Sequence, residues 1–182
     1  ETMQPSRNYP NGNRVFPLLF RTLACCGLRA GEAANLHVKD VDLANGILTI
    51  RQAKHNKTRL VPLSAELWER YIQYGEEMRF EDSDAFFFPN ARGNSHHTNV
   101  IYDRFREALW ACEIQHGGRG HGPRVHDLRH TFAVRSMQKI EKETGDILLS
   151  LPYLSAYLGH YNMNKTQYYL HLVTEVYPEL NR

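Results

Sequence analysis

Cysteine is scarce in this chain of 182 residues, which has only Cys25, Cys26 and Cys112. An odd number with two adjacent members excludes a simple disulfide framework and indicates buried free thiols in a reducing compartment. No apolar run approaches the roughly 18 residues that a membrane-spanning helix needs, and the start shows no signal-peptide pattern. We therefore expect a soluble intracellular chain with no membrane partner.

Net charge is also nearly absent, at +2 from 22 basic and 20 acidic residues. The charges are unevenly distributed, however. Residues 64–85 contain seven acids and two arginines, a local charge of −5, so the rest of the chain carries +7. Residues 51–60 contain two arginines and two lysines with no acid. The distribution predicts one acidic helix turned away from a basic face that suits a polyanion.

The hydrophobic share of 42% favours a folded globular chain, and we find no internal repeat. Residues 1–13 are polar, contain two prolines and show no periodicity, which predicts an arm or the remnant of a linker. The first residue is not methionine. We expect a domain of a longer protein.

Apolar residues cluster from 14 to 26, which predicts a buried helix stopped by Gly27 and compatible with Pro17 only if Pro17 lies in its first turn. A short helix should open near residues 30–32 and end near His37. The spacing of apolar residues then changes from a helical to a strand pattern. The runs VKDVDL and ILTIRQ are separated by Asn45-Gly46, and RLVPL follows. Asn-Gly between such runs predicts a hairpin, and the three runs predict a small antiparallel sheet.

The remaining pattern is helical. Ser64 should cap the acidic helix, which should end near Phe80. The other expected helices span about 98–113, 126–142, 146–158 and 163–171, with a tail from 174. The expected fold class is α+β, mainly helical, with a small three-stranded antiparallel sheet.

The glycine-rich loop 116–122 lacks the Gly-Lys-Ser/Thr ending of a phosphate-binding loop, so we interpret it as a connector. Cys112, His116 and His121 have zinc-ligand chemistry but no second paired set beside them. We therefore predict no metal at these residues.

The segment HDLRH is more informative. On a helix, His126 shares a face with Arg129 and with His130, which would place a proton-transfer group beside an anion clamp. A solvated helix start with Asp127 in its first turn explains the pentapeptide equally well.

Five segments together resemble the catalytic domain of the tyrosine recombinases, the phage-integrase family of site-specific DNA recombinases. In the family's order they are GLRAGEAANL, KHNKTRLVPL, HDLRHTFA, LGH and TQYYLHL, and they span Gly27 to Leu172. The resemblance implies the catalytic residues Arg29, Lys54, His126, Arg129, His160 and Tyr169, with Glu32 as the acid that supports Arg29.

The sequence departs from the family pattern in places. Lys54 lacks the usual flanking glycines, so Lys57 is a second candidate for the lysine, and Tyr168 is a second candidate for the nucleophile beside Tyr169. The stretch between Arg129 and His160 is longer than expected by roughly two helical turns. The family's N-terminal DNA-clamping domain does not appear in this sequence.

The resemblance implies a reaction that needs neither a metal nor a cofactor and proceeds through a 3′-phosphotyrosine and a Holliday junction. Its partners would be double-stranded DNA with specific recombination sites and a homo-tetramer on two duplexes. The expected domains are the arm 1–13, the catalytic domain 14–172 and a tail 173–182 that docks on a neighbouring protomer or packs on its own domain. The expected DNA-binding residues are Arg51, His55, Lys57, Arg59, Arg119, Arg124 and Lys165.

The expected role is integration or excision of a bacterial mobile element, in the cytoplasm and associated with the nucleoid. Two enzyme alternatives use the same chemistry, a type IB-like topoisomerase and a hairpin telomere resolvase. Alternatives of another class are a catalytically inactive DNA-binding accessory protein and a zinc-binding interaction domain.

Overall fold

The computed structural model describes residues 9–51, 58–115, 117, 121–159 and 169. Its elements in chain order are α1 (Gly12–Cys26), α2 (Ala30–Ala34), η1 (Val38–Asp40), β1 (Val41–Asp42), β2 (Ile47–Arg51), β3 (Thr58–Pro62), α3 (Ala65–Met78), α4 (Thr98–Ala111), α5 (Val125–Thr144), η2 (Ile147–Leu149) and α6 (Ser150–Leu158). The predicted fold class, mainly helical with a small antiparallel sheet, is confirmed.

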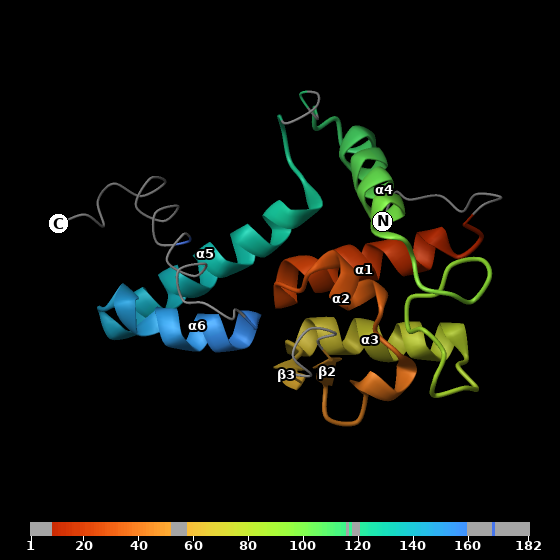
Figure 1. Cartoon of the computed structure of the whole chain (residues 1–182), viewed down its shortest axis with the longest axis horizontal. Helices are drawn as coiled ribbons and strands as arrows, with labels where there is room; N and C mark the ends of the chain where they lie inside the picture. The colour runs from red at the N-terminus through yellow and green to blue at the C-terminus, as the bar shows by residue number, and fades with distance from the viewer. Residues whose placement is uncertain (1–8, 52–57, 116, 118–120, 160–168, 170–182) are drawn as a thin grey trace.

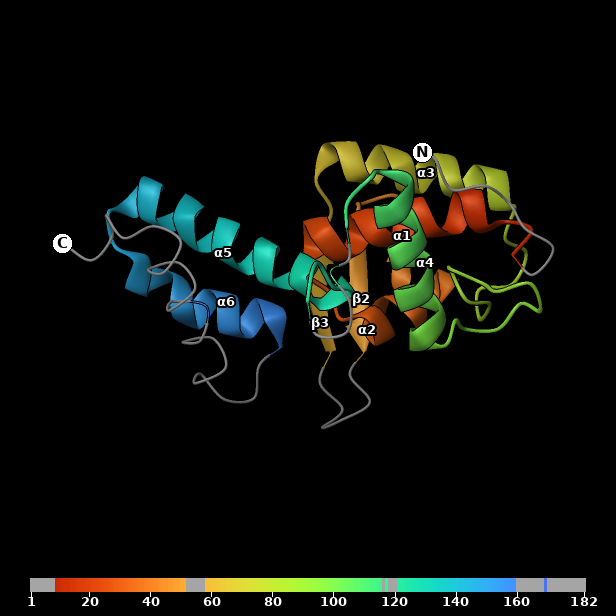
Figure 2. The ribbon, with the colours of Figure 1, turned by 90° about the horizontal axis from the view of Figure 1, so that it is seen from above.

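Two regions are evident in Figure 1. The N-terminal body comprises α1 to α4 and the sheet, and the helical hairpin comprises α5, η2 and α6. Each region has its own apolar cluster. The first turns of α5 pack against α1, and the rest of the helical hairpin projects outward from the body (Figure 2).

Helix α1 is the central helix of the N-terminal body. Val15, Phe16, Leu19 and Leu23 are buried along one stripe, as the apolar clustering predicted. The helix ends at Gly27, whose φ of 60° is the left-handed conformation that glycine adopts without strain.

The start of α1 differs from the prediction. The helix begins at Gly12, within the segment expected to be an arm, so Pro17 lies in the second turn. The described end of that segment is packed, because the Tyr9 ring lies 5.9 Å from that of Phe16 and the Arg104 guanidinium lies 4.2 Å from the Tyr9 ring. The helix thus starts two residues earlier than predicted, and these contacts favour a packed start over a free arm.

The three strands pair antiparallel in the order β1-β2-β3. Leu48 and Val61 face each other across β2 and β3, and both are fully buried. The first strand is shorter than predicted, because Val38 and Lys39 donate their backbone N–H groups to Ala85 and Ser83 rather than to a strand. Residues 38–40 accordingly form the short helix η1.

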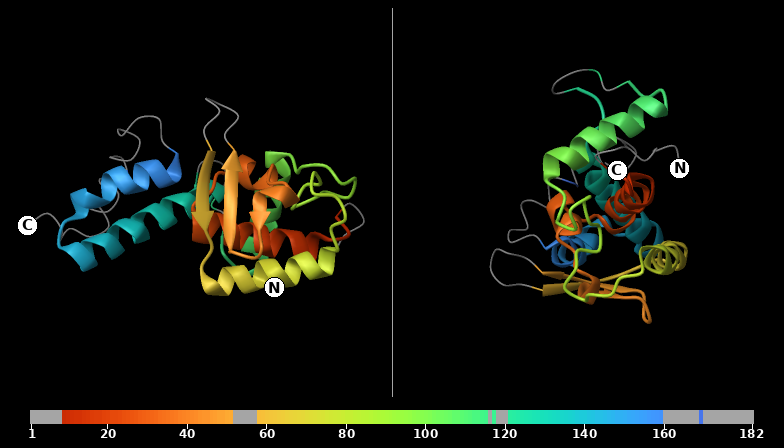
Figure 3. Two further views of the ribbon diagram at one scale, coloured as in Figure 1. Left: turned by 90° about the horizontal axis from the view of Figure 1, so that it is seen from below. Right: turned by 90° about the vertical axis from the view of Figure 1, so that its right-hand side faces the viewer.

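Helix α3 is the predicted acidic helix. Ser64 caps it by accepting the backbone N–H of Leu67, and its acids are exposed. Since β3 leads into α3 at Pro62, the helix lies beside the opposite end of the strands from Arg51 and Thr58 (Figure 3). The acidic charge is therefore separated from the basic end of the strand pair.

The predicted later helices are present with small shifts at their ends, as α4, α5 and α6. Residues 146–149 form a cap and the short helix η2 before α6. The predicted helix 163–171 and the tail 173–182 lie outside the described residues, apart from Tyr169. None of the helices in the described part of the chain combines the length and apolar character of a membrane span.

Candidate active site

The predicted catalytic residues that the structure describes, together with Glu32, lie where the N-terminal body meets the helical hairpin. Arg29 and Glu32 come from the start of α2, while His126 and Arg129 come from the first turns of α5. Tyr169 packs against α5 and α6. Lys54, His55, Lys57, Arg119, His160, Lys165 and Tyr168 lie outside the described residues.

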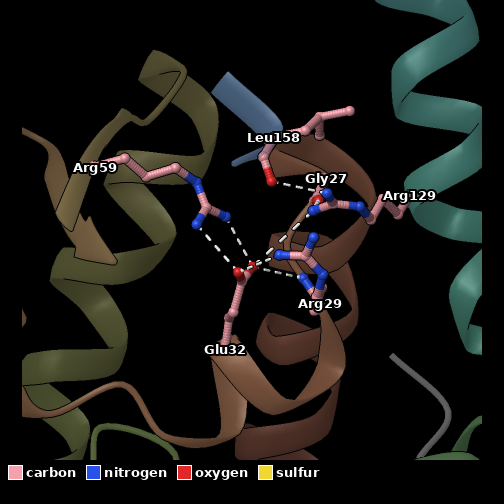
Figure 4. A network of polar contacts seen from close by, with 6 residues as sticks. All are labelled: Gly27, Arg29, Glu32, Arg59, Arg129 and Leu158. Carbon is pink, nitrogen blue, oxygen red and sulfur yellow. Dashed lines mark hydrogen bonds and ion pairs between the residues drawn. The ribbon is translucent and has the colours of Figure 1, made fainter. Parts of the chain in front are cut away.

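Arg129 is a buried guanidinium held by backbone carbonyls. Its Nη1 donates to the carbonyl of Gly27 at 2.6 Å and its Nη2 to the carbonyl of Leu158 at 2.8 Å (Figure 4). These carbonyls belong to the C-terminal ends of α1 and α6, where the helix dipole places partial negative charge. Two helix ends therefore fix the position of one cation.

Gly27 makes this arrangement possible. An added Cβ there would lie 2.4 Å from the Phe132 ring of α5, so any larger residue would force that ring to shift. The Phe132 ring stacks on the Tyr157 ring of α6, with 5.3 Å between their centroids, so the packing continues from α5 to α6. The close approach at Gly27 brings Arg129 within reach of the Gly27 carbonyl.

Arg29 is held differently, by a carboxylate. Its Nη1 donates to Glu32 Oε1 at 2.8 Å, and its backbone N–H donates to Glu32 Oε2 at 2.9 Å, which is a capping-box geometry at the start of α2. The Arg29 side chain is 40% exposed, whereas that of Arg129 is 2% exposed. One cation of the site thus faces solvent while the other is enclosed.

Glu32 connects three arginines. It accepts two hydrogen bonds from Arg59, at 3.1 and 2.8 Å, and its Oε2 lies 4.0 Å from Arg129 Nη1 (Figure 4). Burial alone would raise the pKa of Glu32, but the hydrogen bonds and charges of Arg59 and Arg29 outweigh it and lower that pKa. Glu32 therefore stays ionised among these guanidiniums.

The pKa of Arg129 is lowered by burial and then by the charge of Arg29, while Tyr169 and Glu32 raise it in part. An arginine keeps its proton through such a shift. A cation held beside another cation in a buried position is primed to receive an anion.

Tyr169 is buried and hydrogen-bonded to Arg129. The ring of His130 lies 5.4 Å from the Tyr169 ring and 4.6 Å from the His126 ring. Burial is the largest factor that lowers the pKa of His126 and that of His130. The tyrosine thus lies beside a guanidinium and a pair of imidazoles that are neutral at pH 7.

The expected DNA-binding arginines occupy different environments. The Arg51 side chain is 61% exposed and pairs with Asp40 at 2.7 Å, and the Arg124 side chain is 63% exposed and pairs with Asp127. Arg59, by contrast, is 11% exposed and directed at Glu32. DNA contact stays a prediction for all three.

The sequence interpretation missed several features of this site. The partnership of Arg59 with Glu32 went unnoticed, because Leu60 and Val61 are both apolar and do not reveal which face of β3 points inward. His130 was noted only as a neighbour of His126 on the helix. The carbonyls of Gly27 and Leu158 carry no side-chain signal at all.

The zinc interpretation gains no support from geometry. Within the ranges that the structure describes, no three His, Cys, Asp or Glu side chains gather as a metal ion would require. His116, one of the residues considered, lies outside those ranges.

Comparison with known proteins gives a consistent result. Residues 13–175 match the phage integrase family. The chain is 38% identical to y4rB, a candidate integrase/recombinase of Sinorhizobium fredii (strain NBRC 101917 / NGR234), over 84% of the chain and 50% of that protein. It is 34% identical to tyrosine recombinase XerC of Chromobacterium violaceum, over 83% of the chain and 46% of that protein.

Among solved structures, the XerH site-specific recombinase bound to a palindromic difH substrate aligns with a TM-score of 0.68 at 23% identity, over 98% of this chain and 47% of that one. At that identity the likeness shows the fold alone. The chain spans about half the length of the curated relatives it matches.

Proposed function

Because the chain belongs to the phage integrase family, we propose that it is the catalytic domain of a tyrosine-type site-specific recombinase that cuts and rejoins DNA through a phosphotyrosine intermediate. The observation that carries the proposal is the Arg129 guanidinium, which lies between two helix ends, beside the charge of Arg29 and in a hydrogen bond with Tyr169. A nucleophile and two fixed cations at one point suit attack on a phosphodiester.

The chemistry requires such cations. A phosphodiester is anionic and repels nucleophiles, so its transition state must be stabilised by preorganised positive charge. Arg29 and Arg129 supply that charge: the exposed Arg29 guanidinium can contact non-bridging oxygens directly, and the enclosed Arg129 adds fixed positive charge beside it. Removal of one such fixed donor costs on the order of 10²–10³ in rate in comparable sites.

In the cleavage step, the phosphoryl group is transferred from the 5′-oxygen to Tyr169. Tyr169 Oη attacks the phosphorus, its proton passes to the neutral pair His126 and His130, and a 3′-phosphotyrosyl ester forms as the bond from phosphorus to the 5′-oxygen breaks. Lys54 gives the departing 5′-oxygen a proton, and His160 donates a hydrogen bond to the phosphate. These last two roles follow from the family resemblance.

Rejoining reverses the step with a second 5′-hydroxyl, since the tyrosyl ester conserves the phosphodiester bond energy. Recombination then needs four protomers on two duplexes and a Holliday junction. The family match and the likeness to the tyrosine recombinase XerC favour a DNA partner. The integrase/recombinase naming of the Sinorhizobium relative favours integration or excision of a bacterial mobile element. Action on the chromosome would place the protein at the nucleoid of the cytoplasm.

The test is a covalent trapping experiment with short duplexes, each nicked near its centre and randomised in sequence on both sides of the nick. Cleavage next to the nick releases a short fragment and traps the protein on DNA as an adduct that resists denaturing electrophoresis. We expect the adduct with the wild-type chain and with Tyr153→Phe, a control tyrosine on α6 that is 72% exposed. We expect none with Tyr169→Phe.

The other outcomes separate the alternatives. An adduct that survives Tyr169→Phe and disappears with Tyr168→Phe moves the nucleophile by one position. DNA binding without any adduct supports an accessory binding module. Relaxation of supercoiled DNA without site dependence supports a type IB-like topoisomerase.

A further inference from the structure

Arg59 faces the interior of the N-terminal body from the strand that leaves the 51–58 connection. It pairs directly with Ile50 across β2 and β3, and paired residues share one face of a sheet. Ile50 and Val61 are buried on that face, while Leu60 between Arg59 and Val61 is exposed. The alternation therefore directs Arg59 inward, unlike Arg51 at the end of the neighbouring strand.

The Arg59 guanidinium forms a two-pronged contact with Glu32. Its Nη1 lies 3.1 Å from Oε1 and its Nη2 lies 2.8 Å from Oε2. Arg29 uses the same two oxygens, Oε1 through its Nη1 and Oε2 through its backbone N–H. Each oxygen of Glu32 is thus shared by Arg29 and Arg59 (Figure 4).

This sharing has an electrostatic consequence. Three guanidiniums surround one carboxylate, so the group carries a surplus of two positive charges. While Arg59 neutralises Glu32, Arg29 and Arg129 keep their charge for an anionic ligand. Without Arg59, Arg29 would become the main partner of the Glu32 carboxylate. The carboxylate would then compete with a phosphate for the Arg29 guanidinium.

We propose that Arg59 is a positioning residue of this site: it joins β3 to Glu32 and thereby sets the orientation and the available charge of Arg29. The proposal rests on the proposed function. It assigns Arg59 an indirect role in place of the DNA contact expected from the sequence, because both of its Nη atoms are engaged by Glu32 and its side chain is 11% exposed.

The kinetic test separates binding from chemistry. Arg59→Gln, Glu32→Gln and the double variant are compared in single-turnover adduct formation on the nicked duplexes at saturating protein, and in affinity for intact duplex. We expect Arg59→Gln to slow adduct formation roughly 10- to 100-fold, as misplacement of a catalytic group does, with affinity changed less than about twofold. Arg59→Lys should fall between, since it keeps the charge but loses the planar fork.

The double variant is the decisive comparison. If Arg59 acts by neutralising Glu32, removal of both partners should cost much less than the two single losses combined. Additive losses, or weaker DNA affinity with an unchanged rate at saturation, would overturn the proposal. Arg70→Gln is the matched control, because Arg70 pairs with Glu66 on the surface of α3.

A second measurement does not depend on cleavage. In nitrogen-15 NMR spectra of the arginine side chains, Arg59→Gln should shift the Arg29 resonances, while Arg70→Gln should leave them in place. Unmoved Arg29 resonances would overturn the proposal even in an active enzyme. A shift in a chain that forms no adduct would sustain the positioning contact and count against the recombinase function alone.

Discussion

The N-terminal body and the helical hairpin each contribute one arginine to the site, and they hold these arginines by different means. The body holds Arg29 through a carboxylate that Arg59 shares, and leaves its side chain 40% exposed. Arg129 of the hairpin is held by carbonyls at two helix ends, Gly27 of the body and Leu158 of the hairpin, and its side chain is 2% exposed. Arg29 therefore pairs only within its own region and stays partly exposed, whereas Arg129 bonds to both regions and ties them together.

The largest expected effect follows from Arg129. Arg129→Ala should abolish measurable adduct formation, because the cation beside Tyr169 is lost. Loss of one fixed donor lowers the rate by about 10²–10³-fold, and we expect at least that reduction here. The substitution should also lower the free energy of unfolding by about 2–6 kcal/mol, since two buried carbonyls lose donors worth about 1–3 kcal/mol each. Urea denaturation measures the free energy of unfolding. An unchanged value would contradict the view that Arg129 ties the two regions together.

Arg29→Ala should separate the two effects. We expect a loss in adduct rate of about 10²–10³, with the free energy of unfolding changed by less than about 1 kcal/mol, as for a partly exposed ion pair. Glu32 retains its two hydrogen bonds from Arg59. A stability loss as large as that of Arg129→Ala would show that the two arginines are held alike.

Gly27→Ala probes the boundary between the regions. The left-handed φ of Gly27 and the nearby Phe132 ring predict a loss of about 1–3 kcal/mol in the free energy of unfolding. Because the Gly27 carbonyl accepts from Arg129, adduct formation should slow as well. Gly145→Ala is a matched control, since Gly145 also has a left-handed φ but no atom within 4 Å of an added Cβ.

The smallest expected effect is a pH dependence of stability shared by both regions. Burial is the largest factor lowering the pKa of His96 in the body and of His126 and His130 in the hairpin. Such groups bind protons more readily when unfolded, so stability present above pH about 6.5 should fall as the pH drops below it. Urea midpoints at pH 7.5 and 5.5 measure this fall, and His96→Phe should reduce it. A rise in stability at the lower pH would contradict the account.

Much of the fold was predictable because local patterns determine it. The Asn45-Gly46 turn, the Ser64 cap and the stop at Gly27 each depend on a few adjacent residues, and each is present. The start of α1 and the short β1 were predicted less well. Both depend on contacts with distant segments, at Arg104 and at residues 83–85.

The site shows the same division. Motif order indicated Arg29, Arg129 and Tyr169, and the structure brings Arg129 to both of the others. The contact of Arg59 with Glu32 joins residues 27 positions apart, and it depends on which face of β3 turns inward. The helix-end carbonyls that hold Arg129 belong to the backbone, which a pattern of side chains does not report.

The central claim is that Tyr169, brought to Arg129 at the junction of the two regions, attacks a phosphodiester. The most direct measurement is peptide mapping of the covalent adduct by mass spectrometry after nuclease and protease digestion. The account predicts a nucleotide joined through its 3′-phosphate to the peptide residue Tyr169. A nucleotide on Tyr168 or on any other residue, or one joined through a 5′-phosphate, would contradict it.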